Sequence, residues 1–188
     1  MDSLQLPARR ELFELDTPAA FQSVAAAGAL EVADAGWWES LIAACNYRLM
    51  AAEPDVAEVR EWADALLAVL AAALQAGQVR GSEVLRRKAA VKVALLETFG
   101  RGNADLICAE LLYDVAGLGE QPDRVSSEIL RVRNGEVLPR KRIAELQGLR
   151  QIFLEIRRIR EQVADQEIAS ALDSWCAALN LGEKNGGR

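Results

Sequence analysis

An apolar stripe of unusual length runs through the C-terminal part of the chain, from about Pro139 to Leu181. Its members recur every three or four residues, the spacing that places side chains on one face of an α-helix. At about 1.5 Å per residue, a continuous helix of this extent is about 64 Å long. A compact domain of 188 residues is only about 35–40 Å across. This segment therefore constrains the fold more than any other.

Three arrangements reconcile such a helix with the size of the chain. It projects from the domain, it breaks near Gly148 or Asp165, or it packs on another chain. Part of the stripe has the alternating steps of three and four residues that are typical of a coiled-coil seam. The seam residues are Leu149, Ile152, Ile156, Ile159 and Val163. We predict that this seam contacts another protein or a second copy of the chain; the alternative is a helix that folds back over the bundle and breaks once.

The rest of the chain has the composition of helices. Hydrophobic residues make up 51% of the sequence, Ala and Leu above all, and alternating runs rich in Val, Ile or Thr are missing. Proline, glycine and asparagine residues separate segments whose apolar residues recur with the period of an α-helix. At the start of one such segment, Thr17 is a candidate N-cap before Pro18. We predict an all-α fold with seven to eight helices. We expect a helical bundle over residues 1–138. A long amphipathic C-terminal helix should follow over 139–182, and a disordered tail over 183–188.

Side chains that catalyse reactions or bind metals are scarce. The chain has no His, which removes the commonest general base and the commonest metal ligand. Its cysteines, Cys45, Cys108 and Cys176, have no paired spacing, and their odd number excludes a complete disulfide framework. The glycine turns at 100–102 and 117–119 lack the Gly-Lys-Ser/Thr sequence of a phosphate-binding loop. We predict no catalytic residue, no cofactor and no metal site; an enzyme that uses only carboxylates and Arg is a third, weaker interpretation.

The distribution of apolar residues also bears on location. The longest unbroken apolar run, 65–74, is about half of what a membrane span requires. The N-terminus lacks the charged and apolar regions of a signal peptide. We predict that the protein makes no membrane contact and is cytoplasmic.

Charge is distributed unevenly along the chain. The net charge is −8 over residues 1–79, +5 over residues 80–160 and −3 over residues 161–188. Such segregation indicates either faces that offset each other within the fold or separate surfaces for partners.

Two adjacent tryptophans form a second candidate contact surface. Side chains of neighbouring helical residues point about 100° apart, so Trp37 and Trp38 rarely enter one core together. Tryptophan is enriched where proteins meet. We predict that one of the pair contacts a partner; the alternative is that both are partly buried at the start of a helix.

A basic stretch lies between residues 131 and 142. It surrounds Gly135 and Pro139, and Ile143, Ala144 and Leu146 follow it. With the residues before it, this stretch resembles the second half of a lambda-repressor-type helix-turn-helix domain, over residues 122–146. In that family the recognition helix ends at a Gly, and a Pro starts a helix with an Ile-Ala-x-Leu pattern.

The resemblance implies DNA contacts from exposed polar and basic residues of this region. These are Ser126, Ser127, Arg131, Arg133, Arg140, Lys141 and Arg142. The first half of the motif departs from the pattern, because a long acidic segment, 117–123, stands where a short helix and a glycine turn belong. The net charge of −6 also opposes binding to phosphates.

The leading hypothesis is therefore a non-enzymatic helical interaction protein, such as an adaptor, a chaperone or an accessory or regulatory subunit. The alternative is a DNA-binding transcriptional regulator with a divergent helix-turn-helix at about 122–146.

Overall fold

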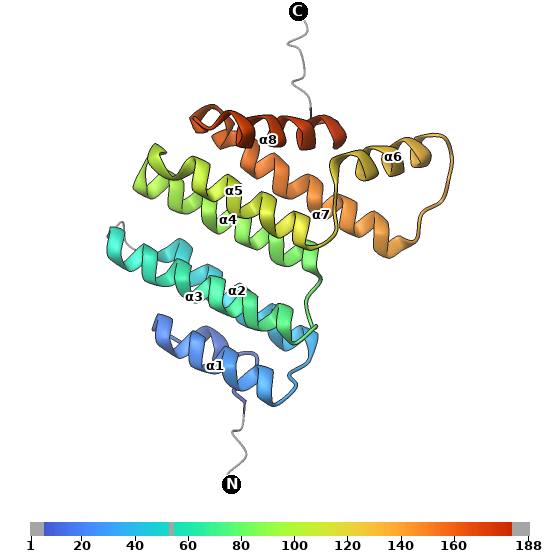
Figure 1. Cartoon of the computed structure of the whole chain (residues 1–188). Coiled ribbons are helices and arrows are strands. Elements are labelled where there is room, and N and C mark those ends of the chain that lie inside the picture. Colours follow the sequence, from blue (N-terminus) through green and yellow to red (C-terminus); the bar gives the residue numbers. More distant parts are fainter. Residues whose placement is uncertain (1–5, 53–54, 182–188) are drawn as a thin grey trace, which may run out of the picture. The chain divides into compact units, whose positions relative to one another are not determined.

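The computed structural model describes residues 6–52 and 55–181, and within them every regular element is a helix. This confirms the predicted all-α fold, with eight α-helices in the part of the chain that is described (Figure 1). The α-helices are α1 (Pro18–Leu30), α2 (Ala35–Ala51), α3 (Val56–Gln75), α4 (Gly81–Phe99), α5 (Ala104–Gly117), α6 (Pro122–Arg133), α7 (Arg140–Ile156) and α8 (Gln166–Ala178). Three 3-10 helices accompany them: η1 (Glu11–Glu14), η2 (Arg101–Asn103) and η3 (Arg157–Gln162). The predicted tail, 183–188, lies outside the described residues.

The chain forms two compact units, 1–91 and 92–188, and the division falls within α4. In the first unit, α3 packs against both α1 and α2, and η1 packs against α2. The Phe21 ring of α1 meets the Trp62 indole of α3 edge to face, with ring centroids 5.6 Å apart. Leu66 and Leu70 of α3 are fully buried, as the apolar run of this helix predicts. The predicted cap of α1 is also confirmed, because the Thr17 hydroxyl accepts from the backbone N–H of Ala20.

In the second unit, α8 packs against α5, α6, α7 and η3. The described residues from 139 to 181 thus belong to the packing of this unit. The Phe153 ring of α7 stacks on the Trp175 indole of α8, with centroids 4.9 Å apart and planes inclined by 17°. Leu111 of α5 and Leu149 of α7 are buried in the same unit.

The amphipathic segment that begins near Pro139 is not one continuous α-helix, and of the three predicted arrangements the structure shows the one with a break. The α-helix ends at Ile156, a 3-10 helix follows, and the backbone is extended at Val163 before α8 begins. The helix α8 therefore folds back alongside α7 instead of prolonging it (Figure 1). The break lies next to Asp165, one of the two positions at which the sequence allowed one.

Asp165 stabilises this break. Its carboxylate accepts hydrogen bonds from the backbone N–H groups of Glu167 and Ile168, at 2.9 and 3.0 Å, and so caps α8. The carboxylate of Asp105, on α5, accepts from the backbone N–H of Asp165 at 2.7 Å. The Arg160 guanidinium of η3 donates two hydrogen bonds to Asp173 of α8. The turn is thus fixed from both sides by polar contacts.

The residues of the predicted seam are core residues of the second unit. All five have exposed fractions of 8% or less: Leu149, Ile152, Ile156, Ile159 and Val163. Because the segment breaks and its seam is buried, its length no longer exceeds the size of the domain and does not require a partner at this seam. Among the described residues, no helix is long and apolar enough to cross a lipid bilayer.

Replacement of Ile152 by Ala tests this placement. Ile152 is fully buried, so we expect the free energy of unfolding of the second unit to fall by about 2–5 kcal/mol through lost burial and the cavity left behind. Native-state hydrogen exchange of the α7 and α8 amides measures the change. Gln151→Ala, at an exposed neighbouring position, is the control and should leave exchange unchanged. A change in molecular mass without a change in exchange would instead place Ile152 in an interface.

Candidate functional site

The tryptophan pair lies inside the first unit. Trp37 and Trp38 have exposed fractions of 6% and 0%, and their rings meet at 90° with centroids 5.2 Å apart. The Trp37 indole N–H donates to the backbone oxygen of Pro7 at 3.0 Å. A Cβ atom added at Gly28 of α1 would lie 2.5 Å from the Trp37 ring, so glycine is needed for this close approach. Both indoles are therefore core side chains, and neither offers an exposed contact surface.

The best candidate for a binding site is an apolar groove of the second unit, between α6, α7 and the end of α8. Its volume is about 380 Å³, within the size range of small-ligand and peptide-anchor sites. Its apolar lining consists of Ile129, Val132, Ile143, Leu146 and Leu179. Its polar border consists of Arg133, Gln147, Arg150 and Asn180.

The groove exists because α7 carries two apolar stripes. One stripe, which contains Leu149 and Ile152, enters the core of the unit. The other contains Ile143 and Leu146, one turn apart, and faces the groove. On α6, Ile129 and Val132 are also three residues apart and form the facing wall. Two helices thus present partly exposed apolar side chains to the same space.

Part of this apolar surface is open to solvent. The side chains of Val132 and Ile143 are 40% and 37% exposed, and Leu130 and Val137 nearby in the chain are more exposed still. Leu179 is buried and forms part of the groove lining. The next residue, Asn180, adopts a positive φ of 54° that ends α8. Clustered apolar exposure of this kind marks interaction surfaces more often than isolated exposed residues do.

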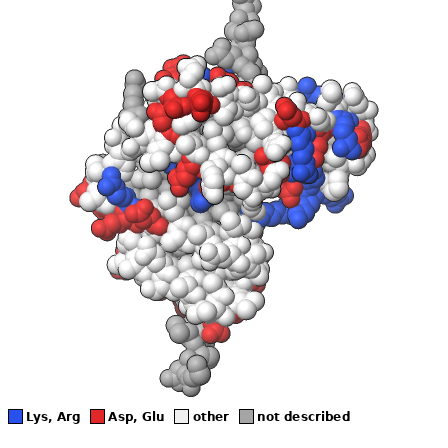
Figure 2. Space-filling view, in the orientation of Figure 1, with Lys and Arg blue, Asp and Glu red and all other residues white. Residues whose placement is uncertain are grey.

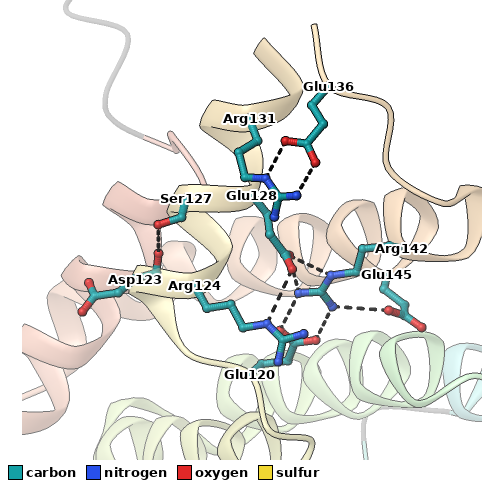
Figure 3. A network of polar contacts seen from close by, with 9 residues as sticks. All are labelled: Glu120, Asp123, Arg124, Ser127, Glu128, Arg131, Glu136, Arg142 and Glu145. Carbon is teal, nitrogen blue, oxygen red and sulfur yellow. Dashed lines mark hydrogen bonds and ion pairs between the residues drawn. The ribbon is translucent and has the colours of Figure 1, made fainter. Parts of the chain in front are cut away.

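Arg142, at the start of α7, is the centre of the polar network that joins α7 to α6 (Figure 3). Its guanidinium donates to Glu128 of α6 at 2.8 Å and to Glu120, just before α6, at 2.9 Å. A third, longer hydrogen bond reaches Glu145 on α7 itself, at 3.3 Å. The side chains of Arg142, Glu120 and Glu128 are only 12–13% exposed.

This network sets the position of α6 against α7. Hydrogen bonds to Glu120 and then to Glu128 raise the pKa of Arg142 above its usual value, although burial acts in the opposite direction. Partly buried charges of this kind cost free energy to desolvate, and the cost is offset only while every partner is in place. Because α6 has just one buried residue of its own, Val125, this polar contact supports that groove wall together with the packing of α6 on α8.

The predicted nucleic-acid contacts divide into paired and unpaired groups. Arg131 donates two hydrogen bonds to Glu136, which raises the pKa of Arg131 and lowers that of Glu136. Arg142 is held in the network described above. The Ser127 hydroxyl donates to the backbone oxygen of Asp123 at 2.8 Å, and Ser126 is exposed. Two of the five predicted basic contacts are therefore neutralised within the chain.

The other three basic residues remain exposed. Arg140 and Lys141 lie at the start of α7, where the Lys141 ammonium is 3.9 Å from Glu145, and Arg133 borders the groove. Figure 2 shows basic side chains gathered over the α6–α7 corner with acidic side chains among them. The corner is thus mixed in charge and not a uniform basic surface.

A second hollow lies in the first unit, between α2 and the start of α4. Its volume is about 710 Å³, and its lining includes Glu39, Arg80, Glu83 and Arg87. Burial acts to raise the pKa of Glu83, but hydrogen bonds from Arg86 and Arg87 outweigh it, so the pKa of Glu83 lies below its usual value. The Glu83 carboxylate is therefore already satisfied, and the hollow is larger but more polar than the groove of the second unit. We take the apolar groove as the candidate site, since ligand sites are mostly apolar with a few polar groups.

The cysteines do not form a reactive site. Burial raises the pKa of Cys45 to about 12 and that of Cys108 to about 11. Burial also raises the pKa of Cys176, which is half-buried. Because the thiolate is the nucleophile, none of the three is activated at neutral pH. The described residues contain no group of three or more His, Cys, Asp or Glu side chains placed to hold a metal ion.

Comparison of the chain with protein-family models, with curated proteins and with solved structures finds no match.

Alkylation tests the state of the thiols. In the folded protein we expect iodoacetamide to modify Cys176 first, more slowly than free cysteine, because its thiol is half-buried and its pKa raised. Cys45 and Cys108 should stay unmodified until urea unfolds the chain. Mass spectrometry of the digested protein measures each site. Fast modification of Cys45 or Cys108 under native conditions would contradict the burial described here.

Replacement of Arg142 tests the network that supports the groove. Arg142→Ala removes the cation bound by the partly buried Glu120 and leaves Glu128 with only the exposed Arg124, so we expect the second unit to lose about 3 kcal/mol of stability. Arg124→Ala is the matched control, because Arg124 contacts the same Glu128 at 3.5 Å but is 62% exposed. It should cost less than about 1 kcal/mol. Hydrogen exchange of the α6 and α7 amides measures both; equal losses would show that the network does not support α6.

Proposed function

We propose that this protein is a non-enzymatic helical interaction protein, such as an adaptor, a chaperone or an accessory subunit. Its proposed binding surface is the groove between α6, α7 and the end of α8, and the proposed ligand is a segment of another protein. The observation that supports this most directly is an apolar groove with partly exposed walls and exposed arginines at its border. The predicted partner surface thus moves from the buried seam of α7 to another side of the same helix.

The lining of the groove favours binding over chemical catalysis. Its ionisable groups are Arg133 and Arg150, and a guanidinium stays protonated and cannot accept a proton. The thiols of the chain lie elsewhere and have raised pKa values. Apolar walls with a polar border are instead what the centre and rim of a protein interface require.

DNA binding is the second candidate, because Arg133, Arg140 and Lys141 remain exposed around α6 and α7. Two features of the same corner weigh against it. Arg131 and Arg142 already bind carboxylates, and Glu136 and Asp123 would oppose an approaching phosphate. We also propose a cytoplasmic location, in keeping with free and largely buried thiols that suit a reducing compartment.

Site-specific photo-crosslinking in the cells that make the protein tests the proposed function. A photoreactive amino acid at Val132 or at Ile143 should form an adduct with the same protein, identified by mass spectrometry, because both positions face the groove. Leu130 is the matched control, since it is exposed on the same helix but does not line the groove. Adducts with no protein, or equal adducts from Leu130, would contradict the proposal. Adducts with nucleic acid would favour the second candidate.

A further inference from the structure

The groove combines its apolar walls with cations that the chain itself leaves unpaired. Arg133 and Arg150 are exposed, and neither side chain makes a hydrogen bond or an ion pair with any residue in the described ranges. Five other arginines of the second unit are paired with carboxylates, namely Arg124, Arg131, Arg142, Arg158 and Arg160. Arg140 and Arg157 have no such ion pair in the described part of the chain, but neither lines the groove. Acidic residues are thus available in this unit, yet none of them is placed on the two arginines at the groove.

Unpaired arginines beside an apolar groove favour an anionic ligand. A guanidinium forms two parallel hydrogen bonds with a carboxylate, and such charge-assisted contacts are about twice as strong as neutral ones. Gln147 and Asn180 supply further amide groups at the same border. The charge on the groove therefore complements a ligand with acidic side chains next to an apolar surface, and it opposes a basic one.

The spacing of the walls indicates a helical ligand. From Ile143 to Arg150, the groove face of α7 covers two helical turns, or about 10 Å. Leu146, Gln147 and Arg150 lie three, four and seven residues after Ile143, and on α6 Val132 and Arg133 lie three and four residues after Ile129. Helices pack by fitting rows of this kind into one another, and an amphipathic helix laid into such a groove is a common mode of recognition.

We propose that the groove binds an acidic amphipathic helix of a partner protein. Its apolar face would lie on α6 and α7, and its Glu or Asp side chains would bind Arg133 and Arg150. This inference rests on the proposed function and makes it specific: it names the chemistry of the partner segment.

Two synthetic peptides of about 15 residues, or four helical turns, test the charge preference. Both carry Leu at helical spacing on one face; one has Glu on the flanking positions and the other Lys. In fluorescence anisotropy at low ionic strength with the full chain, we expect the Glu peptide to bind at least about tenfold more tightly than the Lys peptide. Equal affinities, or no binding of the Glu peptide, would overturn the inference.

Charge reversal in the protein provides the second half of the test. Arg133→Glu combined with Arg150→Glu should weaken binding of the Glu peptide about tenfold or more and strengthen that of the Lys peptide. Arg140→Glu combined with Lys141→Glu is the matched control, since it changes the net charge equally at exposed residues that do not line the groove. Equal losses in the two variants would assign the effect to long-range charge and contradict a site at the groove.

The same protein variants and crosslinking positions distinguish the other possible occupants of the groove, namely a second copy of the chain and a partner segment that is not acidic. Concentration-dependent self-association that Arg133→Glu combined with Arg150→Glu abolishes would identify the occupant as a second copy of the chain and overturn the inference. Photo-crosslinking from Val132 and Ile143 does not depend on peptide charge. If it captures a protein while the peptides show no charge preference, the proposed function stands and the acidic-helix inference fails.

Discussion

The second unit depends on helix α8, which packs against α5, α6, α7 and η3 and whose Trp175 indole stacks on the Phe153 ring of α7. These two residues come from opposite sides of the break at Asp165, so neither could be buried in this way if the helix continued. The turn converts one long amphipathic segment into two helices whose apolar faces both enter the core of this unit. A surface that would otherwise demand a second chain becomes the core of a single unit, and only the remaining side of α7 is left to form the groove.

The fold class, the succession of helices and several of their ends could be predicted from the sequence, because they follow from local patterns. The Thr17 hydroxyl caps the first turn of α1, and Pro18 is the first residue of that helix, as the sequence predicts. The break in the C-terminal segment is different, because the apolar spacing continues through it. Ile159 and Val163 remain buried although the backbone has left the α-helix. The capping carboxylate of Asp165 is a local signal, but the hydrogen bond from its backbone N–H to Asp105 is a tertiary contact that no local pattern contains.

The candidate site was harder to predict, because exposure depends on what surrounds a helix and not on the helix alone. Two adjacent indoles cannot share one face, yet both are buried because α2 is covered by η1, α1 and α3 together. The close approach of α1 depends on Gly28, a residue that carries no chemical signal of its own. Conversely, Ile143 and Leu146 fit a helix-turn-helix pattern in the sequence, and the structure instead shows them as the wall of an apolar groove.

Charge pairing separates the structural arginines of this region from the ones available to a ligand. In the sequence, the residues between 131 and 142 form one basic run; in the fold, Arg131 and Arg142 are bound by carboxylates, while Arg133 is not. A paired, partly buried arginine cannot take a new anion without losing the contacts that offset its desolvation. An exposed, unpaired arginine has no such contacts to lose, so its interaction with a carboxylate is a gain. Arg142 thus holds together the two helices that supply the groove walls, and Arg133 and Arg150 remain free at the groove for recognition.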